Sequence, residues 1–375
     1  MKVLVAGDWH SELHEEVMAS SLRSMGHFVS EFRWHTYFQV RAAQRAVISN
    51  LWRRVQNKYI VGQAVTRLNR DFLCTCRDEA PDLVFVYRGT HILGKTLRRA
   101  RSLLPRCVFV GYNNDDPFGP GQPEYLWRHF LNALPEYDLV LAYRHINIKE
   151  YLRAGARRVE LWRSWFVASR NHPVEMTPEQ IREFGTDVVF VGHYEPDERL
   201  EYLEQMARQG IAFRLFGPGY DWNPVLEKSA LLCGHIPVRL VWGGEYNLAL
   251  AGAKIALCFL SKLNRDTYTR RCFEIPATGT LLLSEYSEDL AEMFEEGIEA
   301  DYFRNSDEMI SKIMIYLGDD NLRQRVASAG RARLLRDGHD VDSRMRQLLA
   351  WADSLASEKT PRSIEGHPKT ETVNL

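Results

Sequence analysis

Short apolar runs alternate with helix-length segments along most of the chain, and this alternation constrains the fold more than any other feature. A first group of runs lies at residues 3–6, 28–29, 83–87, 107–111, 139–142 and 159–162. A second group lies at residues 187–191, 212–216, 253–258 and 280–283. Strands that alternate with helices favour parallel sheets covered by helices on both faces. The sequence therefore predicts an α/β protein with two Rossmann-like halves.

The two groups are separated by a segment without strand periodicity, from Arg163 to Thr186. A chain of 375 residues, 45% of them hydrophobic, is long enough for two cores. The expected parts are an N-terminal Rossmann-like domain over 1–165, a linker over 166–186, a C-terminal Rossmann-like domain over 187–338, a helix over 339–357 and a disordered tail over 358–375.

Charge and cysteine usage exclude several classes of protein. The 48 Lys and Arg residues nearly cancel the 49 Asp and Glu residues, which argues against a nucleic-acid-binding protein. The six cysteines form no CxxC pair, which favours reduced thiols over a zinc site. The apolar run before Asp8 is too short for a signal peptide, and none approaches the roughly 18 to 20 residues of a membrane helix. We therefore expect a cytoplasmic protein.

In an open parallel sheet, ligands bind beyond the carboxyl ends of the strands, and two loops of the second half fit a phosphorylated ligand. Gly192 and His193 follow an apolar run and precede a helix that contains Arg199. A glycine lets a ligand approach the backbone, and free N–H groups with an arginine suit a diphosphate. Gly217 lies in a loop flanked by aromatic residues, which could accept a nucleobase. Both patterns are also typical of plain turns.

The segment from Arg270 to Leu283 is the most informative part of the sequence. It predicts a short helix, a glycine stop and an apolar strand. Arg271 and Glu274 lie among apolar residues, and because burying an unpaired charge is costly, these charges are paired or serve a ligand. We predict that Glu274 accepts the ribose hydroxyls and that Arg271 neutralises the phosphates.

Candidates for acceptor activation follow strands of the first half. Asp8 and His10 follow the first strand, and Asp115 and Asp116 follow the strand that ends near Gly111. Any of these four could deprotonate an acceptor hydroxyl or hold a sugar through its hydroxyls. An Asx-type turn before a proline explains the two aspartates equally well, and a lone loop histidine is often structural.

A basic segment from Arg41 to Arg70 contains no acidic residue. Aromatic and aliphatic residues, such as Trp52 and Tyr59, alternate with its charges. Such a helix suits peripheral contact with an anionic membrane surface. The pattern is also typical of a solvated helix whose apolar stripe packs on its own domain.

Three segments resemble the C-terminal half of the CgeB-like (spore-maturation-type) glycosyltransferases, relatives of the group-1 family of GT-B fold. They are 187–199 (DVVFVGHYEPDER), 271–283 (RCFEIPATGTLLL) and 294–330. The resemblance implies two Rossmann-like domains that face a central cleft, with a C-terminal helix that crosses back to the N-terminal domain. In the larger family a Glu-x7-Glu pair holds the donor. Glu274 matches the second acid, and Asp266 stands in the place of the first.

The resemblance implies transfer of a sugar from a nucleotide-sugar without a divalent metal or other cofactor, with retention at the anomeric carbon. The expected acceptor is a cell-envelope glycan, a lipid-linked sugar or a protein, and the expected location is the cytoplasm or the inner face of the membrane. Two alternatives stay open: a nucleotide-sugar epimerase of the same fold, and a non-catalytic nucleotide-sugar-binding protein. A dehydrogenase is not expected, since no GxGxxG follows any predicted strand.

Overall fold

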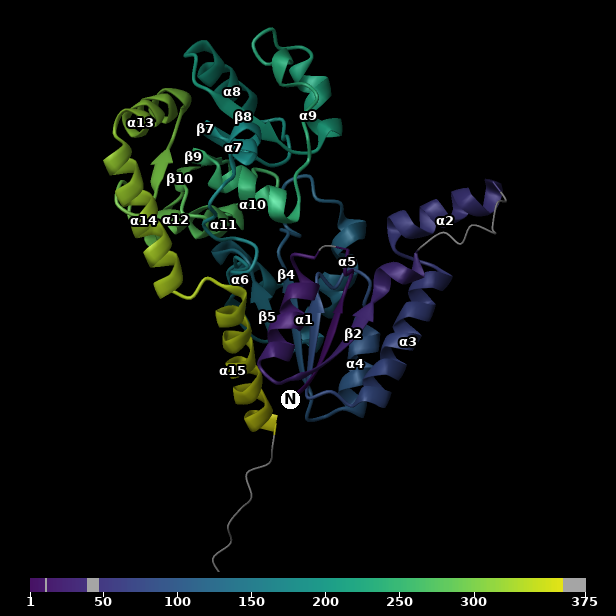
Figure 1. Cartoon of the computed structure of the whole chain (residues 1–375). Coiled ribbons are helices and arrows are strands. Elements are labelled where there is room, and N and C mark those ends of the chain that lie inside the picture. Colours follow the sequence, from purple (N-terminus) through teal and green to yellow (C-terminus); the bar gives the residue numbers. More distant parts are fainter. Residues whose placement is uncertain (11, 39–46, 360–375) are drawn as a thin grey trace, which may run out of the picture.

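Two α/β domains, each built on a parallel sheet, make up the computed structural model, which describes residues 1–10, 12–38 and 47–359. The domains lie one above the other, with the chain crossing between them twice (Figure 1). The predicted fold class is confirmed. The apolar runs became strands because strands that are covered on both faces need apolar residues at every position.

The N-terminal domain has six parallel strands in the order β2-β1-β3-β4-β5-β6. Its strands are β1 (Lys2–Gly7), β2 (Phe28–Arg33), β3 (Leu83–Tyr87), β4 (Val108–Asn113), β5 (Leu139–Ala142) and β6 (Val159–Leu161). Its helices are α1 (Glu15–Ser24), α2 (Val47–Tyr59), α3 (Gln63–Glu79), α4 (Gly94–Leu103), α5 (Glu124–Ala133) and α6 (His145–Arg153), with short 3₁₀ helices η1 (Trp34–Tyr37) and η2 (Leu134–Glu136).

The C-terminal domain has five parallel strands in the order β11-β10-β9-β7-β8. They are β7 (Thr186–Val191), β8 (Phe213–Phe216), β9 (Ala253–Cys258), β10 (Leu281–Glu285) and β11 (Asp301–Phe303). The helices are α8 (Arg199–Arg208), α9 (Gly219–Leu226), α10 (Gly243–Ala251), α11 (Arg271–Ala277), α12 (Glu288–Met293), α13 (Ser306–Gly318) and α14 (Asp320–Arg336), with the 3₁₀ helix η3 (Cys233–His235).

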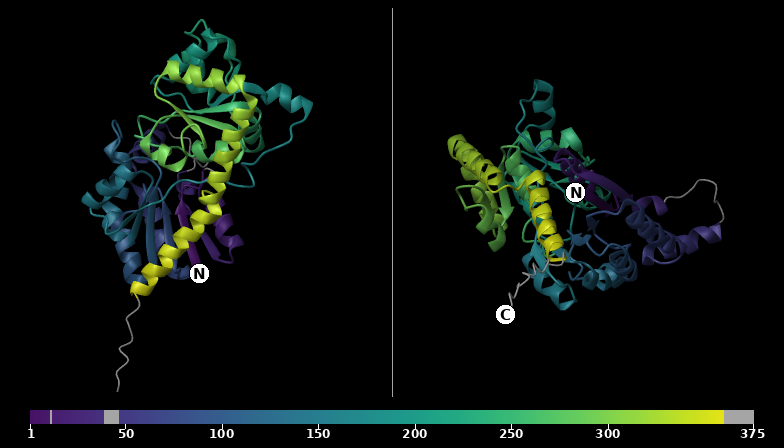
Figure 2. Two further views of the ribbon diagram at one scale, coloured as in Figure 1. Left: turned by 90° about the vertical axis from the view of Figure 1, so that its left-hand side faces the viewer. Right: turned by 90° about the horizontal axis from the view of Figure 1, so that it is seen from below.

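Two helices belong to neither of the two domains described above. Helix α7 (Pro178–Phe184) lies within the segment predicted to be a linker, and a capping box between Thr177 and Gln180 begins it. Helix α15 (Val341–Lys359) runs back along the N-terminal domain (Figure 2). Ser21 of α1 donates a hydrogen bond to Asp342 at 2.5 Å, and Lys359 lies 2.6 Å from Asp138 beside β5. The last helix therefore ties the two domains together.

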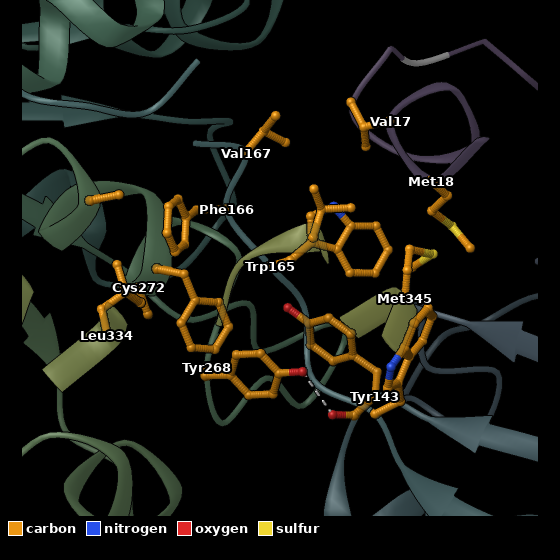
Figure 3. Close-up of a cluster of buried hydrophobic side chains, with 14 of the residues drawn as sticks. Val17, Met18, Tyr143, Trp165, Phe166, Val167, Tyr268, Cys272, Leu334 and Met345 are labelled. Carbon is orange, nitrogen blue, oxygen red and sulfur yellow. Dashed lines mark hydrogen bonds between the residues drawn. The ribbon is translucent and has the colours of Figure 1, made fainter. Parts of the chain in front are cut away.

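One apolar core runs through both domains. Figure 3 shows Trp165 and Phe166 from the crossing segment together with Tyr143, Tyr268 and Met345, all of which belong to this core. The rings of Tyr143 and Tyr268 stack across the interface, with centroids 4.5 Å apart and planes at 8°. Two further cores cover the opposite faces of the two sheets. The domains are thus joined by apolar packing as well as by polar contacts.

Three other expectations concern the chain as a whole. Within residues 1–10, 12–38 and 47–359, none of the helices combines the length and the hydropathy needed to cross a membrane. All six cysteines are free thiols, and the sulfur atoms of Cys258 and Cys272 lie 3.6 Å apart. No three His, Cys, Asp or Glu side chains of the described residues converge as metal ligands.

Candidate functional site

A cavity of about 180 Å³ lies between the two domains, at the carboxyl ends of the strands. Its N-terminal wall comes from α1, from the loops that follow β4 and β5, and from the crossing segment. Its C-terminal wall comes from the loop between β9 and α11. The lining residues are His14, Asn114, Asp115, Tyr143, Arg144, Ser164, Asn264, Asp266 and Arg270. Since ligands of parallel sheets bind at this edge, we take the cavity and the adjoining loops as the candidate site.

Two glycines bring the C-terminal strands close together at this edge. The Trp222 indole donates a hydrogen bond to the Gly192 carbonyl at 2.8 Å. A Cβ atom on Gly217 would overlap that same carbonyl oxygen, so only glycine fits there. A Cβ atom on Gly192 would lie 3.3 Å from Nη1 of Arg271. The Gly192 backbone therefore lies directly beside the Arg271 guanidinium.

Arg271 and Glu274 share the first turn of α11. The Tyr246 hydroxyl donates to Oε2 of Glu274 at 2.5 Å, and burial raises the pKa of this carboxyl group. The Nε atom of Arg271 is buried and has no hydrogen-bond partner in the described part of the chain. Burial opposes its charge, but the nearby Cys258, Tyr246 and Glu274 side chains outweigh this and raise its pKa. A buried donor of this kind is costly unless a ligand accepts from it.

Arg199 shapes the loop that follows β7. Its buried guanidinium donates to both carboxylate oxygens of Asp197 at 2.7 Å and to the His193 carbonyl at 2.7 Å. The exposed His193 ring lies 2.8 Å from the Asp221 carboxylate on α9. Because Asp197 and the His193 carbonyl already accept the hydrogen bonds of Arg199, this arginine could contact a diphosphate only after the loop had opened. That arrangement favours Arg271 over Arg199 as the phosphate ligand.

Asp266 pairs with the opposite domain. The side chain of Arg144, which is 1% exposed, donates through Nε and Nη2 to one oxygen of Asp266, with Nε at 2.8 Å. Its Nη1 donates to the Asn114 carbonyl at 3.0 Å, and its guanidinium lies 4.7 Å from the centre of the Tyr143 ring. Burial opposes the charge of Arg144, but Asp266 more than offsets this and raises the Arg144 pKa. Asp266 thus forms a wall of the cavity and links the domains.

The two adjacent carboxylates after β4 have different surroundings. Asp116 is fully buried and accepts hydrogen bonds from Asn147 at 2.9 Å and from Arg265 at 2.5 Å. Arg265 belongs to the C-terminal domain, so Asp116 forms a second link between the domains. Asp115 instead lines the cavity, and its carboxylate lies 2.5 Å from Nη2 of Arg88. Asp115 is therefore the one of this pair that faces the space between the domains.

Asp8 and His10 follow β1, as predicted from the sequence. Asp8 is half-buried, and its backbone carbonyl is hydrogen-bonded to the His35 ring. His10 is exposed. Neither is among the described residues that line the cavity.

Sequence reasoning missed three basic side chains in or next to the N-terminal wall. His14 lines the cavity with its ring 5.0 Å from that of Tyr87, and burial, reinforced by Arg270 and Arg88, lowers its pKa. A neutral imidazole can accept a hydrogen bond from a hydroxyl group. The other two are Arg88 and Arg144. Both come directly after predicted strands. The expectation that ligands bind beyond the carboxyl ends of strands therefore also selects these two residues.

Backbone strain gathers around the same space. Three residues other than glycine in loops near the cavity have left-handed backbone angles: Trp9 (φ 55°) after β1, Arg88 (φ 61°) after β3 and Arg265 (φ 48°) between the cavity residues Asn264 and Asp266. Such conformations cost of order 1 to 3 kcal/mol each and cluster at functional sites. Their positions agree with a site between the domains.

Several solved structures share this architecture along nearly the whole chain. HepE from Anabaena in complex with UDP gives a TM-score of 0.64 at 14% identity, with 94% of this chain and 100% of that chain covered. Sucrose-phosphate synthase from Thermosynechococcus elongatus gives 0.68 at 11%, covering 96% and 100%. A putative UDP-N-acetylglucosamine 2-epimerase from Listeria monocytogenes gives 0.56 at 13%, covering 96% and 98%. At these identities the likeness shows the fold.

Sequence comparison gives a match to part of the C-terminal half of the chain, less than half of its length. Residues 199–350 match the model of a family described as glycosyl transferase-like. This region includes Asp266, Arg271 and Glu274. No curated protein matches the chain. The chain thus has the GT-B fold, and its segment 199–350 matches the glycosyl transferase-like family.

Proposed function

We propose that the protein is a glycosyltransferase that moves a sugar from a nucleotide-sugar to an acceptor held in the cleft. The observation that carries this proposal is the buried, unpartnered Nε of Arg271 beside the Gly192 backbone. A diphosphate would supply the missing acceptor atoms, and its negative charge would match that of the guanidinium. The family match over residues 199–350 supports the same reaction class.

In this proposal the donor lies along the C-terminal wall. Glu274 accepts hydrogen bonds from the ribose hydroxyls through Oε1, while the Tyr246 hydroxyl holds Oε2 at 2.5 Å. Arg271 stabilises the negative charge that develops on the departing diphosphate, which is the task a divalent metal performs in other sugar transferases. HepE has been solved in complex with UDP-glucose, so uridine donors are the first to test.

The acceptor hydroxyl, held at the N-terminal wall, attacks the anomeric carbon on the face from which the diphosphate departs, and the new bond forms as the bond to the diphosphate breaks. Asp115 and His14 line the cavity and are the groups positioned to accept the hydroxyl hydrogen. We further propose a CgeB-like enzyme that retains anomeric configuration, on the resemblance of its motifs. We propose a cytoplasmic enzyme that acts on a cell-envelope glycan, a lipid-linked sugar or a protein, next to the inner face of the membrane.

Thermal unfolding in EDTA tests the donor site. The purified protein would be heated with UDP-, GDP-, ADP- and dTDP-sugars in turn, and a bound donor raises Tm in proportion to its occupancy. We expect one nucleotide class to raise Tm in the wild type and to lose this effect in Arg271→Gln and Glu274→Ala. The matched controls are the exposed Arg208→Gln and Glu227→Ala, which should respond like the wild type. Absence of any shift in folded wild-type protein would refute the donor site.

An epimerase can have this fold, as the putative Listeria epimerase illustrates, and it could bind the donor through the same residues. Product analysis separates the two reactions, because an epimerase converts the nucleotide-sugar without releasing nucleotide. A protein that binds the donor but neither releases nucleotide nor converts the sugar, with water or a panel of glycans as acceptors, would instead be the non-catalytic alternative.

A further inference from the structure

Helix α2 stands apart from the rest of the N-terminal domain. It projects beside α3 and α5 in two views (Figures 1 and 2). Its C-terminal end contacts α5: His129 of α5 bonds to the Ile60 carbonyl at 2.8 Å, and the rings of Tyr59 and Tyr125 lie 5.0 Å apart. Of the basic segment predicted from the sequence, residues 41–46 lie outside the described residues. The body of the helix therefore presents much of its surface to its surroundings.

Three apolar side chains in the C-terminal part of α2 are exposed. Trp52, Val55 and Tyr59 are spaced three and four residues apart, which puts them on one face of a helix. Their exposed fractions are 65%, 36% and 41%. A helix whose apolar stripe packed on its own domain would bury these side chains. The exposure of these three side chains favours peripheral membrane contact for this part of the segment.

Exposed positive charge also lies on this part of α2, with Lys58 beside the apolar side chains and Arg54 further round the helix. Arg54 and Lys58 are exposed and lie one helical turn apart. The Lys58 ammonium group lies 5.7 Å from the centre of the Tyr59 ring, so the charge sits beside the apolar face. The sequence of α2, VISNLWRRVQNKY, contains no acidic residue. The combined surface is apolar and cationic, with no carboxylate from the helix itself.

We propose that α2 docks on an anionic lipid bilayer, with Trp52, Val55 and Tyr59 in the interfacial region and Arg54 and Lys58 against lipid phosphates. An indole ring and a tyrosine ring suit the boundary between headgroups and acyl chains, and basic residues attract anionic lipid. Charge complementarity selects the bilayer over a second copy of this helix, because two copies would bring like charges together.

The position of α2 links this surface to the cleft. It packs on α5, which begins at Glu124, shortly after the loop that carries Asp115. A bilayer on α2 would therefore lie on the side of the N-terminal domain that leads to its cleft wall. An acceptor carried by that bilayer would have a short path to the cavity.

Co-sedimentation of the full-length protein with vesicles tests the proposal without any knowledge of the sugar substrate. One set of vesicles is pure phosphatidylcholine, and the other is equal parts phosphatidylcholine and phosphatidylglycerol. We expect binding to the anionic vesicles only, weakened by added salt. Trp52→Ala should reduce binding, and Arg54→Gln with Lys58→Gln should reduce it by about fivefold per charge.

Matched controls lie on the C-terminal domain. Tyr220→Ala removes an equally exposed aromatic ring, and Lys228→Gln with Arg325→Gln removes two exposed charges. These variants should bind vesicles like the wild type. Equal binding to both vesicle types, no binding at all, or equal losses in the controls would overturn the proposal. So would a concentration-dependent dimer in sedimentation velocity that Trp52→Ala dissolves, since that result assigns the face to a second copy of the chain. None of these outcomes depends on donor binding, so the donor-site proposal stands or falls separately.

Discussion

Replacing Asp266 by asparagine should destabilise the protein strongly, although the two side chains are nearly the same shape. The substitution leaves Arg144 buried at 1% exposure without a carboxylate partner. Removing one partner of a buried pair costs about 3 to 5 kcal/mol. The Asn114 carbonyl and the Tyr143 ring still face the guanidinium, and an amide oxygen can still accept from it. We therefore expect about 3 kcal/mol, at the low end of this range.

This loss should be visible as a lower Tm. At about 2 to 4 °C per kcal/mol for domains of this size, Asp266→Asn should unfold roughly 6 to 12 °C below the wild type. Differential scanning calorimetry at neutral pH measures the difference. The matched control is Glu179→Gln in the exposed pair with Arg182, which should leave Tm within experimental error of the wild type.

The double variant Arg144→Met/Asp266→Asn tests whether the pair itself is responsible. It removes the buried cation together with the carboxylate, so it should be more stable than the sum of the single variants by about 1 to 3 kcal/mol. The reasoning would be refuted if the stability change of the double variant equalled the sum of the two single changes. It would also be refuted if the Tm of Asp266→Asn lay within experimental error of the wild type. The interdomain pair would then contribute nothing measurable.

Three further perturbations have outcomes that follow from single contacts. Gly217→Ala places a methyl group against the Gly192 carbonyl, so it should lower stability by about 1 to 3 kcal/mol in urea unfolding and weaken donor binding. His339 is buried with its Nδ1 2.6 Å from Arg344, and burial holds its pKa at about 3. The unfolded chain takes up this proton below pH 6.5 and the folded chain does not, so stability is lost as pH falls from 7 to 5. His339→Asn should remove about 2 kcal/mol of that loss, and an unchanged pH profile would contradict it. Thr177→Ala deletes the cap of α7 and should cost about 1 kcal/mol, with no effect on donor binding.

The sheets were predictable because their strands are buried on both faces. The runs at Leu83–Tyr87, Leu139–Ala142 and Ala253–Cys258 became strands with the predicted ends. Strand β11 was missed because it has only three residues and begins with Asp301. Helix α7 was missed because its cap signature lies in a segment with prolines and no strand periodicity. Local patterns thus identify buried strands well and short elements poorly.

The site was predictable only as a set of loops. Chain order fixes which loops follow the strands, and Arg271 and Asp115 were proposed as site residues in this way. Local sequence does not reveal the partner of a charged side chain. Arg199 is neutralised by Asp197 two residues away, and Asp266 by Arg144, which lies 122 residues away. Such partners depend on the packing of one domain against the other, which no single segment encodes.

The path of α15 has a consequence for how the chain folds during synthesis. A ribosome releases residues in order, and N-terminal domains commonly fold before the rest of the chain has been made. Here Ser21 of α1 pairs with Asp342, and Asp138, next to the start of β5, pairs with Lys359. Both partners in α15 are synthesised more than 200 residues after Asp138. The first domain made would thus expose an apolar groove until the last helix arrives. A nascent chain halted before Val341 should therefore be captured by chaperones that bind exposed apolar surface.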